Sequence, residues 1–109
     1  METIAIVLSV GRDRVDEFEA GFRAHELPVW QDLESKGLLA RASLSKLDIS
    51  SKSVAGSVQY LVIAVFTSDE GHHAHDSHPG FEAWNKLADA FQVGEPLAFG
   101  GETIIAFDG

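Results

Sequence analysis

The order of hydrophobic periodicities along this 109-residue chain constrains its fold more than any other feature. Apolar side chains alternate over residues 3–10, as they do in a strand, and from residue 12 they recur with the roughly 3.6-residue period of a helix. The same two periods then recur further along. The predicted elements are a strand at 3–10, two helical segments at 12–26 and 28–36, strands at 39–49 and 57–67, a short turn at 69–76, a helix at 79–91 and a last strand at 96–107.

Proline and glycine set the predicted bounds of the first helical region. Pro28 lacks a backbone N–H and clashes with the preceding turn, so we expect a kink or a split near Glu26 and Leu27. Gly37 is typical of a helix C-terminus.

Three further signals shape the second half of the chain. Thr67 and Glu70 have the spacing of a capping box, so a helix can begin there, and Pro79 favours a restart near residue 78. Gly100 and Gly101 predict a bulge or a close backbone approach within the last strand.

These elements are arranged along the chain in the order β-α-β-β-α-β. That order predicts an α+β domain of the ferredoxin-like class, in which two helices cover one face of a four-stranded antiparallel sheet. The length and the absence of an obvious linker predict a single domain over residues 1–109.

The sheet face away from the helices is also predicted to be apolar. Strands 3–10 and 57–67 carry large apolar residues on both faces, for example Tyr60 and Val62 on one and Leu61 and Ile63 on the other. A monomer rarely exposes an apolar patch of that size, so we expect a homodimer joined sheet to sheet.

Charge and composition exclude several function classes. The net charge is −9, with the basic residues scattered, so nucleic acid and anionic membranes are not expected partners. No stretch is apolar enough to span a bilayer, and the N-terminus lacks the basic start of a signal peptide. Zero cysteines exclude disulfides and thiolate sites and are compatible with a cytoplasmic location.

Four of the five histidines fall within seven residues, between His72 and His78, which makes this segment the main candidate for chemistry. His72, His73, His75 and His78, with Asp69 or Asp76, could form a metal site. Pro79 breaks the helical phase, and no familiar zinc motif is present, so no native metal is expected.

The segment from Phe66 to Trp84, together with the element order and the apolar second face, resembles the dimeric α/β-barrel superfamily. Within it the chain is similar to the antibiotic-biosynthesis-monooxygenase-like domains. The pair Ala74 and His75 matches the Ala-His pair of that pattern, and His78, Pro79 and Phe81 match the Pro or His and the aromatic residue that come after the pair.

The resemblance implies a small homodimeric enzyme that oxidises an apolar, quinol-like aromatic molecule without a cofactor. The chain departs from the family after its first helix, where it has Ser35-Lys36-Gly37, and it lacks the asparagine that haem-degrading members use, so haem degradation is not expected. A dimer that binds a ligand without catalysis remains the alternative, and a histidine-based metal-dependent enzyme comes third.

Seven side chains are the candidate site residues, and each also has a purely structural interpretation. His75 matches the family position and is a candidate general base, or else it is paired to Asp76 or to a backbone group. Arg41 could contact an anion or a carbonyl, or form a salt bridge at the rim. The candidate catalytic residues are His75, His78 and His25, and the candidate substrate-binding residues are Trp84, Phe81, Tyr60 and Arg41.

Overall fold

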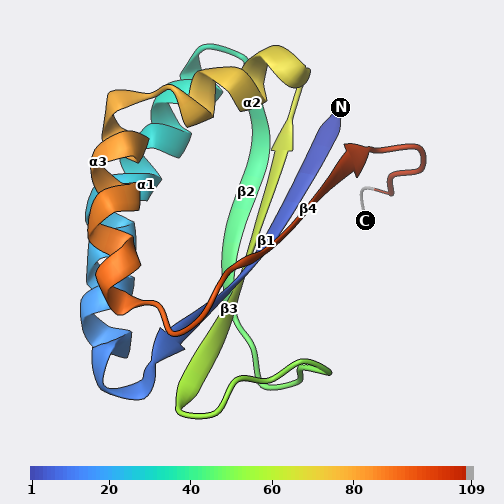
Figure 1. Ribbon diagram of the computed structural model, residues 1–109. Coiled ribbons are helices and arrows are strands. Elements are labelled where there is room, and N and C mark those ends of the chain that lie inside the picture. Colours follow the sequence, from blue (N-terminus) through green and yellow to red (C-terminus); the bar gives the residue numbers. More distant parts are fainter. Residues whose placement is uncertain (108–109) are drawn as a thin grey trace.

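A computed structural model describes residues 1–107 and shows four antiparallel strands in one sheet, β1 (Glu2–Gly11), β2 (Leu39–Lys46), β3 (Ser57–Phe66) and β4 (Leu97–Glu102). Their spatial order is β2-β3-β1-β4, so the two most apolar strands are central (Figure 1). β2 and β3, which follow one another in the chain, pair as an antiparallel hairpin. The α+β, ferredoxin-like prediction is confirmed.

The helices all lie on one side of the sheet (Figure 1). They are α1 (Val15–Ser35), α2 (Asp69–Asp76) and α3 (Pro79–Ala88), with 3-10 turns η1 (Arg12–Arg14) and η2 (Asp89–Phe91). α1 and α3 pack side by side because Gly21 leaves room for a ring. A Cβ atom at that position would lie 2.6 Å from the indole of Trp84.

Two apolar clusters join the helices to the sheet. One lies near the start of α1 and the end of α3. It is rich in aromatic residues, including Phe18, Phe22, Tyr60 and Trp84. The other surrounds Phe66 near α2. The helices are therefore fixed to the sheet at both ends, and the space between the two clusters is available for a site.

The prediction that Pro28 splits the first helix is wrong, because α1 runs unbroken through it. Proline removes only the N–H that would bond to the carbonyl of Ala24. Both Pro28 and Ala24 are exposed, so water can satisfy that carbonyl. Tertiary packing of Phe22, Val29 and other residues on the opposite side holds the helix together.

The segment 69–76, predicted to be a short turn, is the helix α2, and the predicted helix 79–91 ends as an α-helix at Ala88 and continues as η2. The expected capping box is absent, because the hydroxyl of Thr67 donates to the carbonyl of Gly37 at 2.9 Å instead. The restart at Pro79 is confirmed, and His78 caps α3 by accepting a hydrogen bond from Gly80.

The last strand is shorter than predicted, because β4 ends at Glu102 rather than at residue 107. It contains no bulge, since Gly100 pairs in regular register with Ile4. The close approach at Gly100 is real, as a Cβ atom there would lie 2.7 Å from Ile4 Cδ1. The sheet's irregularity lies instead between Leu39 and Arg41.

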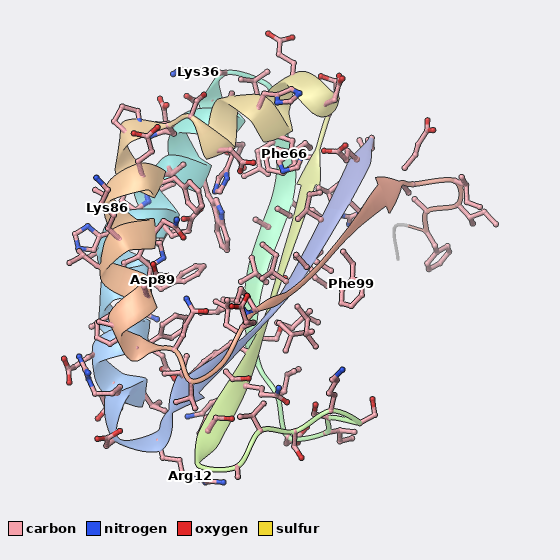
Figure 2. All side chains as sticks on the ribbon, viewed as in Figure 1. Arg12, Lys36, Phe66, Lys86, Asp89 and Phe99 are labelled. Carbon is pink, nitrogen blue, oxygen red and sulfur yellow. The ribbon has the colours of Figure 1, made fainter. Side chains whose placement is uncertain are left out.

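The outer face of the sheet carries an apolar patch in the middle of its two central strands. Val7 and Leu61 are paired there, and Phe99 on β4 remains 63% exposed (Figure 2). The loop before β3 covers one corner, where Gln59 bonds to the Lys52 carbonyl. Beyond β4 the chain extends away from the helices with three nearly fully exposed apolar side chains, Ile104, Ile105 and Phe107 (Figure 1).

None of the helices within residues 1–107 is long and apolar enough to cross a membrane.

Candidate functional site

A cavity of about 790 Å³ lies between the sheet and the helices, within the size range of small-molecule sites. We call it the main cavity. Its walls are mostly apolar, with Ile4, Ile6 and Leu8 of β1 facing Trp30 and Trp84 of the two long helices. Figure 2 shows Phe66 beneath α2 at one end of this space and Asp89 further along, at the end of α3.

His75 lies at the α2 end of the main cavity with a carboxylate on each ring nitrogen. Its Nε2 atom is 2.5 Å from Oε1 of Glu26, and its Nδ1 atom is 3.0 Å from Oδ1 of Asp76. The ring of Phe81 lies 4.3 Å away, centre to centre. His75 is thus both oriented and charge-compensated by its neighbours.

The surroundings of His75 favour its charged form. Burial alone would lower the pKa, but the hydrogen bond and the charge of Glu26, assisted by Asp76, outweigh burial and raise the pKa of His75 above its ordinary value. The Glu26 side chain is only 4% exposed, so this ion pair is shielded from water. Only one Glu26 oxygen is engaged within the described part of the chain.

A second histidine extends this acidic end of the cavity. Nδ1 of His72 lies 2.7 Å from Oε1 of Glu2, and its Nε2 atom lies 3.2 Å from Oδ2 of Asp76. The contact with Glu2 is close, but its angles are not those of a hydrogen bond, so within residues 1–107 the buried Oε1 atom of Glu2 has no hydrogen-bond partner. The main cavity is lined by both histidines and by the three carboxylates that contact them, those of Glu2, Glu26 and Asp76.

His78 and His25 lie outside the set of residues that line the main cavity. His78 caps α3 through Nδ1, and its Nε2 atom lies 3.0 Å from Oδ2 of Asp32. Bonds from Lys36 and then His78 lower the pKa of Asp32. His25 is exposed on α1 and stacks on Trp84 at 5.7 Å.

Two of the four candidate substrate-binding residues, Phe81 and Trp84, line the main cavity. Tyr60 lines a separate side pocket of about 320 Å³ between α1 and β2, where its hydroxyl donates to Glu19. Burial and then the Glu19 carboxylate raise the pKa of Tyr60. Arg41 is exposed on the outer face of the sheet, beside Val65.

The three histidines do not converge on one carboxylate, although His72 and His75 both contact Asp76. His72 contacts Glu2, His75 contacts Glu26 and His78 contacts Asp32. Over residues 1–107 no group of three or more acidic or histidine side chains has the arrangement that a metal ion needs.

Glu26, the buried partner of His75, was not among the residues predicted from the sequence. Its signal was present, because Phe18, Phe22 and Glu26 are spaced four residues apart and therefore lie on one face of a continuous helix. A carboxylate in an apolar stripe indicates a buried partner. The assumed break at Pro28 ended the helix at this residue and concealed the pattern.

Comparison with solved structures confirms the predicted family likeness in fold. A candidate antibiotic biosynthesis monooxygenase from Nitrosomonas europaea matches with a TM-score of 0.77 at 10% identity, covering 96% of this chain and 100% of its own. SnoaB, a cofactor-independent oxygenase from Streptomyces nogalater, gives 0.67 at 17% identity, with 99% and 98% covered. HapK from Hahella chejuensis gives 0.70 at 17% identity, with 100% and 99% covered.

No family model matches the sequence, and no curated protein matches it either. The likeness is therefore one of fold, and the chemistry has to be argued from the side chains.

Proposed function

We propose that this protein is a cofactor-independent, monooxygenase-like enzyme that acts on an apolar, quinol-like aromatic molecule bound in the main cavity. One observation carries the proposal. An imidazole, His75, stands at the end of an apolar cavity of sufficient size and is backed by a buried carboxylate, Glu26. The fold shared with a cofactor-independent oxygenase supports it.

In this proposal His75 accepts the proton of a ligand hydroxyl. A neutral imidazole has one N–H to offer its two carboxylates. Glu26 is buried whereas the Asp76 side chain is 56% exposed, so Nε2–H donates to Glu26 and Asp76 is the partner that yields. The ligand hydroxyl then takes the place of Asp76 at Nδ1, and Glu26 stabilises the imidazolium that forms.

The deprotonated, electron-rich ring reacts directly with dioxygen. For a hydroxylated ring with an adjacent CH₂ group, one oxygen atom replaces the two hydrogens to give C=O and the other leaves as water. Dioxygen is the oxidant and the ring carbon is oxidised, so the balance closes without a further reductant. The apolar walls, including Trp30 and Trp84, hold the ring and exclude water.

The proposal includes a homodimer formed through the outer face of the sheet, in the cytoplasm. Support for the dimer comes from the apolar outer face around Leu61 and Ile63 and from the exposed side chains at Ile104, Ile105 and Phe107. A second copy would cover both features.

Oxygen uptake with a series of quinols and hydroxylated polycyclic aromatics tests the enzyme. We expect uptake that rises with pH as His75 loses its proton, and that falls about 100-fold or more in His75→Ala, as expected on loss of a general base. His73→Ala is the matched control, because His73 is exposed on the same helix and does not line the cavity. Equal uptake by the two variants would refute the proposal. Ligand binding without any oxygen uptake would favour the non-catalytic alternative.

A further inference from the structure

The main cavity carries more negative than positive charge, and no lysine or arginine lines it to balance the difference. Four carboxylates line it, those of Glu2, Glu26, Asp76 and Asp89. All eight lysines and arginines lie within the described residues, and none of them lines it. With His72 and His75 both protonated, the lining still has two more negative than positive groups.

Two buried carboxylate groups have capacity to accept a hydrogen bond from a ligand. Glu26 is 3% exposed and uses one oxygen for His75, and no described residue bonds to the other. Oε1 of Glu2 is buried and also lacks a hydrogen-bond partner in the described chain. A buried acceptor such as Oε1 of Glu2 costs free energy until a donor reaches it. The α2 end of the cavity therefore favours a ligand that donates hydrogen bonds.

From this charge and these acceptors we infer that the main cavity binds aromatic molecules that are uncharged or cationic, with hydroxyl or amino donors, and that it excludes those bearing a carboxylate or phosphate. This rests on the proposed function for the cavity as the substrate site and adds the charge class of the substrate. An anion there would lose its hydration shell and meet a lining in which negative groups outnumber positive ones.

The test uses three naphthalene probes of similar size, none of which carries a phenolic hydroxyl that could be oxidised: 2-naphthylmethylamine, 2-naphthylmethanol and 2-naphthoate. Both tryptophans of the chain line the cavity, so quenching of their fluorescence reports binding. At physiological salt we expect the amine to bind at least as tightly as the alcohol, and 2-naphthoate to bind at least about tenfold more weakly. Isothermal titration calorimetry checks each Kd.

Variants separate the cavity from the net charge of the molecule. Glu2→Gln with Asp89→Asn should reduce the amine-to-naphthoate preference several-fold. Asp13→Asn with Asp48→Asn removes the same charge from exposed residues outside the cavity and should leave the preference unchanged.

Equal affinity for the amine and 2-naphthoate would overturn the inference, as would an equal loss of preference in both pairs of variants or no binding of the amine and the alcohol. Because no probe is turned over, a selective cavity in a protein without oxygen uptake would leave this inference standing while the enzyme proposal failed.

Discussion

The Nε2 atom of His75 lies 2.5 Å from the Oε1 atom of Glu26, a residue 49 positions earlier in the chain. This pair joins the short helix α2 to the long helix α1 at the end of the main cavity. His75, the proposed proton acceptor, therefore also takes part in the contact that joins these two helices.

Glu26→Gln should lower the pKa of His75, because the negative charge that stabilises the imidazolium is lost while burial, which disfavours it, remains. Proton NMR of the imidazole across a pH titration measures the change. Glu34→Gln, an exposed change on the same helix, is the control and should leave the titration unaltered. An unchanged His75 titration in Glu26→Gln would show that the pair does not form in solution.

The folded state should lose stability as the pH rises from the ordinary pKa of histidine through the raised pKa of His75. The sign comes from linkage, because a raised pKa means that the folded state binds the proton more tightly than the unfolded state. The His75 contribution is complete below about pH 6.5, the ordinary value, and is gone above the raised one. Urea unfolding across this range measures it, and a profile of the same shape in Glu26→Gln would contradict the assignment.

Tyr60 should remain protonated well above the ordinary tyrosine pKa for as long as the chain is folded, because burial and the Glu19 carboxylate both disfavour the phenolate. It is the only tyrosine in the chain, so the near-ultraviolet absorbance of tyrosinate reports it alone. We expect that signal to appear together with the loss of helical circular dichroism. A tyrosinate signal that appears near the ordinary tyrosine pKa, while the protein is still folded, would contradict this prediction.

Gly71→Ala should destabilise the fold by about 1–3 kcal/mol, the range typical of overpacking. The added Cβ atom would clash with the carbonyl oxygen of Leu38, a backbone atom with little freedom to move, so α2 would shift away from β3. Gly101→Ala is the control, because its Cβ atom meets nothing within 4 Å. Thermal unfolding of both variants measures the effect, and equal melting temperatures would contradict it.

Ile63→Asp should convert the proposed dimer to a monomer, because it places a charge in the middle of the apolar outer face. Analytical ultracentrifugation of this variant and of Ile49→Asp distinguishes an interface effect from a general one, since Ile49 is exposed in the loop before β3. A parent protein that sediments as a monomer would remove the basis for the sheet-to-sheet dimer.

The periodicity of apolar residues was sufficient to predict the fold. Alternation at residues such as Ile4 and Val62 indicates a strand whichever side chains these residues contact. Proline and glycine were less informative about where helices and strands are interrupted. Pro28 lies on the solvent side of α1 and is tolerated there, and Gly100 makes room for Ile4 without a bulge.

The site could be predicted only in part. His75, a candidate from its place in a family-like segment, lines the main cavity. Its partner Glu26 is remote in sequence, and their contact depends on how α1 packs against α2. His78 and Tyr60 carry suitable chemical groups, yet a helix cap and a second pocket account for where they point. Tertiary packing decides such roles.

Successive side chains of β1 point to opposite faces of the sheet, so neighbouring residues contribute to two different surfaces. Ile4, Ile6 and Leu8 form the floor of the main cavity, whereas their immediate neighbours, among them Ala5 and Val7, lie on the opposite surface of the sheet. An insertion or deletion of one residue in this strand would exchange the two sets of side chains. Variation in β1 that preserves both surfaces is therefore restricted to substitutions.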